Sequence, residues 1–382
     1  MCHQRKPMMT RHQIFLAFLY FVIVLIVLPF FCTEKVYSLY YQADDAKNNR
    51  TDLINNEHRK KGVREYLKQI DPKDSLSFHI SKVSEPVDNL IVVMAKRPNK
   101  VEDLTLTQLV AEVDRNIRNQ KLYRNAMLIC NTTRLPFHEL NHLAQFYPVR
   151  MAVNNTKWKL FNSEEVKKHD FVECLKQGLT YVNSRYITLI RDVVVPYSGF
   201  LGVVNHVINK RITSSLVHGE LLKNDRPWLF LHLHEPVTFR QYHLSCECVR
   251  EILLLTCSGA LLFYLAFRWL EGPLQRSYVR VTYAMYGALY FFTFALVIGR
   301  PYVTELRRMA AELYRVYEPP KPIHFSAMVL PSNILPGLLA QLNLVSCSVY
   351  SPFHELLDHM VNTMELPGYV VSPSLVRYVS RT

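Results

Sequence analysis

Two groups of residues in this chain have side chains suited to chemistry. The first is Arg191 with Asp192, directly after a short apolar run, and the second is His354, Glu355 and Asp358. An arginine supplies fixed positive charge that stabilises a nearby anion. A histidine or carboxylate within hydrogen-bond reach of a hydroxyl acts as a general base. The first group therefore suits an anionic ligand, and the second suits a reacting hydroxyl.

Plainer interpretations of both groups stay open. Arg191 also fits a surface arginine at a site that has lost its activity, and 354–359 also fits a solvated helix face. His354 and His359 are not a zinc-binding HExxH pair, because residues five apart lie about 140° apart around a helix. His354 and Asp358 do share one face of such a helix.

Strand-like and helix-like patterns alternate through the middle of the chain. Continuous apolar runs at 89–94, 126–130, 186–190 and 228–233 are typical of buried strands, whereas 106–117 and 166–182 have helical spacing. Further helices are predicted at 335–344 and 352–364, and a last strand at 368–371. The alternation predicts an α/β fold with helices on both faces of the sheet.

The ends of these strands locate the expected binding site. In open α/β sheets, ligands bind at the carboxyl ends of the strands. The residues there are Lys96, Arg97, Asn131, Arg191 and Asp192. We therefore expect these side chains to contact the ligand.

Three segments are long and apolar enough to cross a membrane, namely 13–31, 252–267 and 281–298. No small-residue cleavage site follows the first, which favours an anchor over a signal peptide. Arginines flank the first segment and occupy the loop 268–280, and such flanks stay cytosolic. The rest is then lumenal; the alternative for the second and third segments is a buried core hairpin.

These features divide the chain into six parts. They are a cytosolic tail (1–12), a transmembrane anchor (13–31), a lumenal stem (32–85), the first half of a globular domain (86–251), a transmembrane hairpin (252–298) and the second half of that domain (299–382).

Composition limits the partners. The formal charge is +13, yet no run of Lys and Arg is dense enough to predict nucleic-acid binding. Cysteines in the lumenal parts permit disulfides, whose pairing the sequence does not give. Sequons at Asn49, Asn131 and Asn154 are candidate glycosylation sites and support a lumenal location. The oligomeric state is not predicted.

Several stretches of the chain resemble one known family. They are Leu128–Asn131, Phe171–Leu175 with Tyr181 and Asn183, Gly299–Tyr302 with Glu305–Arg308, and Tyr369–Val371 with Pro373, Leu375 and Val376. The sequence is similar to the Golgi N-acetylgalactosaminyltransferases that modify glycosylphosphatidylinositol (GPI) anchors, over roughly 85–380.

The resemblance implies a fold, an activity and a location. The fold is a GT-A-like glycosyltransferase domain, a mixed sheet flanked by helices, which a transmembrane hairpin interrupts. The donor is a UDP-sugar, UDP-GalNAc, and the acceptor is the mannose core of a GPI glycolipid or a GPI-anchored protein. The location is a multi-pass Golgi membrane protein with its bulk in the lumen. Lys96, Arg97, Asn131, Arg191 and Asp192 are then donor-binding residues.

The chain departs from the family pattern where a metal ion is held. Family members carry three consecutive acids at 191–193 and a histidine at 378, whereas this chain has Arg191, Asp192, Val193 and Tyr378. Divalent ions need more than one good oxygen ligand, and Asp192 is the only retained candidate. We therefore predict no specific Mn²⁺ dependence.

Two hypotheses follow from this departure. The first is a Golgi glycosyltransferase, with His354, Glu355 or Asp358 as the acceptor-side catalytic group. The second is a catalytically inactive homologue that binds glycolipid or a partner. The substitutions at 191 and 378 favour the second, and the retained family stretches favour the first.

Overall fold

The computed structural model describes residues 11–32, 38–40, 45–96, 104–133, 137–152, 162–217, 220–223, 227–235, 242, 246–271, 277–318, 326–348 and 351–379. The chain divides into two units. One contains residues 1–48 and 237–306, and the other contains residues 49–236 and 307–382.

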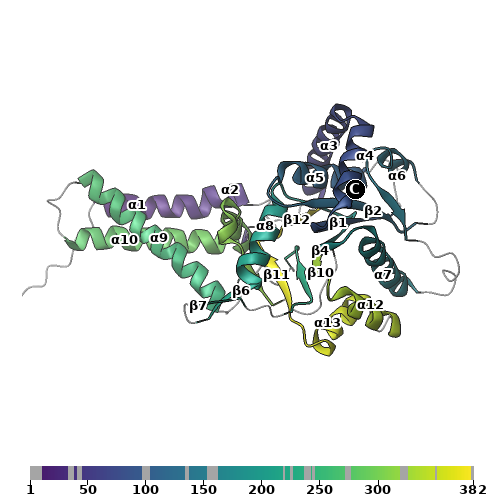
Figure 1. The fold of residues 1–382 in the computed structure, drawn as a ribbon. Coiled ribbons are helices and arrows are strands. Elements are labelled where there is room, and N and C mark those ends of the chain that lie inside the picture. Colours follow the sequence, from purple (N-terminus) through teal and green to yellow (C-terminus); the bar gives the residue numbers. More distant parts are fainter. Residues whose placement is uncertain are drawn as a thin grey trace, which may run out of the picture. The chain divides into compact units, whose positions relative to one another are not determined.

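The second unit is built on one mixed sheet (Figure 1). Its strands, in spatial order, are β3 (Val149–Met151), β2 (Asn125–Asn131), β1 (Val87–Ala95), β4 (Ser184–Arg191), β10 (Ala327–Pro331), β8 (Phe230–His232), β11 (Gly368–Ser372) and β9 (Arg315–Tyr317). β1, β2, β3 and β4 are parallel, and β10 pairs antiparallel to β4. The predicted α/β class, with a mixed sheet and flanking helices, is confirmed.

Strands from both sides of the long apolar insertion share this sheet. β8 precedes the insertion, yet it lies between β10 and β11, which follow it. Met328 is opposite His232, and Gly368 is opposite Phe230. The two sequence segments therefore complete one sheet, and neither has all of its strands alone.

The two faces of the central strands bury different helices. Ile91 and Val93 of β1 belong to the apolar cluster that includes α5 (Thr105–Asn119). Leu90 and Val92 belong to a second cluster. That cluster includes residues of α7 (Ser163–Tyr181), α12 (Leu335–Leu344) and α13 (Phe353–Thr363). Successive strand residues point to opposite faces, so this apolar run needs cover on both sides.

The segment expected to form a stem instead packs into the second unit. α3 (Asp45–Gln69) and α4 (Pro72–Ser81) lie beside α5 (Figure 1). Val63 and Leu67 are buried in the same apolar cluster as α5. The expectation of a separate stem over 32–85 is wrong for 49–84, because α3 carries an apolar face within its charged sequence.

A buried carboxylate joins these helices. Asp114 of α5 accepts hydrogen bonds from Tyr66 and Tyr147 at 3.0 Å, from His79 at 3.1 Å and from Arg118 at 2.9 Å. Burial raises the pKa of Asp114, but the hydrogen bond and charge of His79 and the charge of Arg118 outweigh it, so the pKa lies below its ordinary value. This network fixes α3 and α4 to the domain.

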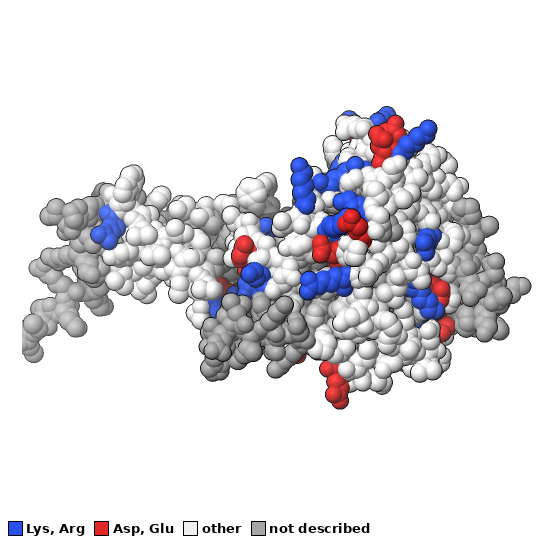
Figure 2. Space-filling view, viewed as in Figure 1, with Lys and Arg blue, Asp and Glu red and all other residues white. Residues whose placement is uncertain are grey.

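The first unit contains the apolar helices. A continuous helix runs from α1 (Arg11–Val22) through a π-helical turn (Ile23–Val27) to α2 (Leu28–Cys32), and α9 (Cys246–Glu271) packs against α10 (Ser277–Ile298). Three spans are long and apolar enough to cross a membrane: Ile14–Cys32, Cys248–Trp269 and Val281–Ile298. Their described surface is almost free of charged side chains in Figure 2. Close approach of α9 and α10 requires glycine, since a Cβ at Gly287 would lie 2.5 Å from the Gly259 carbonyl oxygen.

One ion pair is buried in this unit. α9 begins earlier than the apolar run predicts, so Glu251 lies within the helix. Arg300 of α11 (Arg300–Thr304) directly follows α10. Its Nε lies 2.9 Å from Glu251 Oε2, and a second guanidinium nitrogen lies 3.1 Å from Oε1. The arginine of the family-like stretch at 299–302 therefore has a structural partner.

Candidate functional site

Charged side chains line a pocket of about 220 Å³ in the second unit. It lies at the carboxyl ends of β1, β2 and β4, where ligands of open α/β sheets bind. The lining residues are Met94, Lys96, Thr132, Glu164, Lys167, Asp170, Arg191, Asp192, Phe353, His354 and Tyr378.

Strand register brings the basic residues of this pocket together. Met94 of β1 is opposite Arg191 of β4 in a parallel ladder, so Lys96 and Asp192 leave neighbouring strands at the same edge. Asp192 is buried, with 8% of its surface exposed, whereas Lys96 is exposed. Of the residues expected at the donor site, the structure brings Lys96, Arg191 and Asp192 together at this pocket, while Arg97 lies outside the described residues.

Helices α7 and α13 are joined at the pocket. Glu164 Oε2 accepts a hydrogen bond of 3.1 Å from the Phe353 backbone N–H, and Glu164 also pairs with Lys167. The hydrogen bond with Lys167 lowers the pKa of Glu164; partial burial opposes this effect and the Phe353 N–H supports it. Glu164 is therefore held ionised, and it fixes the start of α13, which carries His354.

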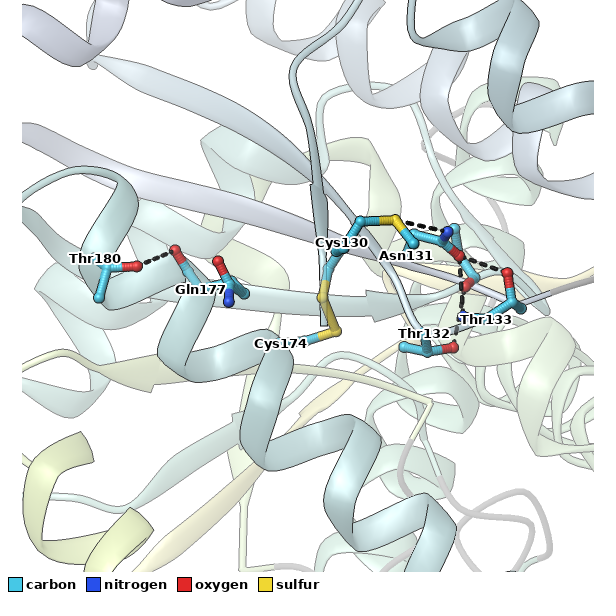
Figure 3. Close-up of a disulfide and its surroundings, with 9 residues drawn as sticks. Cys130, Asn131, Thr132, Thr133, Cys174, Gln177 and Thr180 are labelled. Carbon is cyan, nitrogen blue, oxygen red and sulfur yellow. Dashed lines mark hydrogen bonds between the residues drawn. A yellow bond between two sulfur atoms is a disulfide. The ribbon is translucent and has the colours of Figure 1, made fainter. Parts of the chain in front are cut away.

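A disulfide ties the same helix to the sheet. Cys130 at the end of β2 is bonded to Cys174 of α7, with the two Cα atoms 5.7 Å apart (Figure 3). The sequence does not reveal this pairing. Because Cys174 lies one helical turn beyond Asp170, the disulfide holds the part of α7 that faces the pocket.

Asp170 is a site residue that sequence reasoning missed. Its Oδ1 is buried and has no hydrogen-bond partner among the described residues. Burial raises the pKa of Asp170 to about 7, against the opposing charges of Lys96 and Arg191. A perturbed carboxyl in a pocket is a functional-site signal. The only available sequence signal was its spacing of one turn from Cys174.

A second, short ladder completes the pocket. β12 (Val376–Tyr378) pairs antiparallel with β5 (Val194–Pro196), so that Tyr378 is opposite Val194. The Tyr378 ring packs edge-on against His234, with centroids 4.8 Å apart. Arg191 and Tyr378, where this chain departs from the metal pattern that the family resemblance implies, therefore line one pocket.

The three residues expected on the acceptor side do not all line the pocket. His354 lines the pocket. Glu355 is exposed and Asp358 is buried, and neither lines it. Asp358 lies one helical turn beyond His354 on the same side of α13, and Glu355 lies on a different side, so of the three only His354 reaches the pocket. The geometry therefore retains His354 as the candidate base.

In this fold the Asn131 side chain is not accessible to a ligand. Its side chain is fully buried; its amide nitrogen lies 3.1 Å from the Met151 sulfur, and its oxygen accepts hydrogen bonds from Thr133. Thr132, not Asn131, lines the pocket. The expected donor contact at Asn131 is wrong, and a glycan there is incompatible with this packing. Asn49 lies in α3, and Asn154 lies outside the described residues.

The pocket does not fit a divalent cation. Among the described residues, no group of three or more His, Cys, Asp and Glu side chains is placed to hold a metal ion. Three carboxyl groups line the pocket, but they share it with the cations Lys96, Lys167 and Arg191, which repel a metal ion. Metal independence stays a prediction, and the pocket contains cationic side chains of the kind that bind a diphosphate.

A larger hollow of about 660 Å³ lies at the other end of β4, lined by residues that include Ser184, Arg185, Trp228 and Asn333. Its described lining contains no Asp, Glu or His. Size alone does not make it the reactive site, because it lies at the amino end of β4 and its described lining contains no carboxylate or imidazole to accept a proton from a hydroxyl.

Comparisons with known proteins include a match to a family model. The family model described as GPI-N-acetylgalactosamine transferase PGAP4 matches residues 89–377, which include the described pocket residues other than Tyr378. A crystal structure of a mycobacterial protein aligns with a TM-score of 0.35 and 8% identity, covering 80% of this chain and 72% of that chain. That low score carries no argument.

Proposed function

Because the chain belongs to the GPI-N-acetylgalactosamine transferase PGAP4 family, we propose that it transfers N-acetylgalactosamine from UDP-GalNAc to a mannose of the GPI glycan. The observation that supports this most is the pocket itself. Lys96, Lys167 and Arg191 place positive charge beside His354, at the sheet edge where α/β proteins bind ligands. A diphosphate and a reacting hydroxyl need those two kinds of group.

The proposed reaction uses residues of this chain alone. Lys96 and Arg191 bind the diphosphate of the donor and stabilise the negative charge that develops on UDP as it leaves. His354 takes the proton of the mannose hydroxyl. The hydroxyl oxygen forms a bond to the anomeric carbon of GalNAc, while the bond from that carbon to the phosphate oxygen of UDP breaks.

Location and topology belong to the same proposal. We place the protein in the Golgi membrane, with a cytosolic N-terminus and the catalytic unit in the lumen. The three apolar helices support a membrane location. The disulfide between Cys130 and Cys174 supports an oxidising compartment. In the lumen the enzyme would meet GPI glycolipid or GPI-anchored proteins as acceptors.

One specific observation favours the second candidate, an inactive homologue that binds the donor or the glycolipid. Arg191 and Tyr378 occupy the positions where the family pattern has metal-binding side chains, and both line the pocket. Activity under this proposal therefore depends on the cations of the pocket taking the place of the metal ion.

The test uses the purified full-length chain in detergent, UDP-GalNAc and a mannose-terminated GPI glycan, with EDTA present. The proposal expects transfer by the wild type and a loss of at least about 100-fold in kcat for His354→Gln, a magnitude typical of removing a general base. Glu355→Gln, on the exposed face of α13, serves as the matched control and should retain activity. Donor binding without turnover in the wild type would establish the second candidate.

A further inference from the structure

The charges of the pocket balance when every carboxyl group is ionised. The cations are Lys96, Lys167 and Arg191, and the carboxyl groups are Glu164, Asp170 and Asp192. An organic diphosphate brings additional negative charge into this space. Its binding therefore improves if one carboxyl group becomes neutral.

Among the three carboxyl groups, that of Asp170 is suited to becoming neutral by taking up a proton. Glu164 is held as a carboxylate by Lys167 and by the Phe353 N–H. Asp170 Oδ1, in contrast, is buried without a partner among the described residues, where a negative charge is poorly solvated. Lys96 and Arg191 are the charged groups that favour its ionised form.

Those same two cations are the ones that a diphosphate would engage. Once their charge is shared with phosphate oxygens, they stabilise the Asp170 carboxylate less, and the ligand adds negative charge beside it. A protonated carboxyl group avoids this repulsion and offers an O–H donor to a phosphate oxygen.

We propose that Asp170 is a proton-linked binding residue, which takes up a proton when an organic diphosphate enters the pocket and donates a hydrogen bond to it. This inference rests on the proposed donor pocket. It gives the site a neutral hydrogen-bond donor that supplements its cations without a metal ion. It also makes donor affinity depend on the pH of the compartment.

The sign of that dependence follows from linkage. A group whose pKa rises on ligand binding makes binding tighter as pH falls through the interval between its free and bound pKa. The pKa of free Asp170, about 7, places the lower end of this interval near neutrality. His354 also faces the pocket, and imidazoles titrate in this range, so the test must separate the two.

The experiment is calorimetry of UDP-GalNAc binding to the full-length protein in detergent with EDTA. The diphosphate diester of this probe does not titrate between about pH 6 and about pH 8. Wild-type affinity for UDP-GalNAc should rise about 3- to 10-fold as the pH falls from about 8 to about 6. Measurements in buffers of different ionisation enthalpy should show the uptake of up to about one proton per bound ligand near neutral pH.

Asp170→Asn should bind at about pH 8 at least as tightly as the wild type binds at about pH 6, without proton uptake by this residue. A gain in affinity at high pH cannot come from a damaged fold. Glu173→Gln is the matched control: Glu173 lies on the same helix, pairs with Lys176 at 2.6 Å and does not line the pocket. It should keep the wild-type pH dependence.

Three results would overturn the inference. If proton uptake persists in Asp170→Asn and disappears in His354→Gln, the proton belongs to His354. If UDP-GalNAc binds the wild type with no pH dependence, the inference fails while the proposed donor stands. If UDP-GalNAc binds at no pH, this inference and the proposed function fail together.

Discussion

Tyr378 lies directly opposite Val194 in the antiparallel ladder of β5 and β12. More than 180 residues of sequence, including the apolar hairpin, separate the two. The ladder places the side chain at 378 at the pocket that Arg191 and Asp192 also line. The departures from the family metal pattern at 191 and 378 therefore lie at one site, where this chain has an arginine and a tyrosine.

Arg191→Glu should weaken binding of UDP-GalNAc about 10- to 100-fold, because it reverses the charge offered to the diphosphate. Calorimetry in EDTA measures the effect. Arg185→Glu is the matched control, since Arg185 is on the same strand but lines the other hollow. If Arg191→Glu and the wild type bind UDP-GalNAc with equal affinity, Arg191 is not part of the donor site.

Breaking the buried ion pair of Glu251 and Arg300 should lower the stability of the protein more than replacing both residues with apolar ones. Arg300→Met leaves the Glu251 carboxylate buried without its partner and should cost about 3–5 kcal/mol. Adding Glu251→Leu should recover most of this loss. The measurement is the thermal midpoint of the protein in detergent. If the double variant is no more stable than Arg300→Met, the pair stabilises the fold by more than neutralising its own two charges.

Asp114→Asn should destabilise the second unit by about 2–3 kcal/mol at neutral pH, because hydrogen bonds to a charged acceptor are lost. The pKa of Asp114 in the fold is lower than the ordinary 3.8. Its contribution is therefore present above about pH 4 and is lost as pH falls through the folded pKa. Thermal midpoints of variant and wild type should converge below about pH 4. A difference that is constant with pH would assign the effect to packing.

Helices and central strands were largely predictable from local pattern. The helix at 335–344 has the predicted bounds, and α13 differs from its prediction by one residue at each end. β1, β2 and β4 are apolar runs buried on both faces, which is a strong local signal.

Three short strands depend on distant partners. β5, β9 and β12 have only three residues each, too few to show a period of two. Their existence depends on the ladders that they complete. The pocket could not be assembled from sequence for the same reason: Asp170 and His354 lie on two helices that are joined by long-range contacts such as that of Glu164 with Phe353.

Glycan mapping by mass spectrometry tests the proposed topology. Protein from a secretory cell should carry N-glycans at Asn49 and Asn154, and glycosidase should shift its mobility. Asn131 should be unmodified, because its side chain is fully buried in the fold. Occupancy at Asn131 would contradict the packing at the end of β2, and a protein without glycans at either other sequon would count against a lumenal location.

The central claim is that fixed cations replace a metal ion at the donor pocket. It is tested most directly by calorimetry of the unmodified full-length protein, first with Mn²⁺ alone and then with UDP-GalNAc in either Mn²⁺ or EDTA. The account predicts no stoichiometric uptake of Mn²⁺ and the same affinity for UDP-GalNAc in both conditions. Tight one-to-one binding of Mn²⁺, or donor binding that EDTA abolishes, would contradict it.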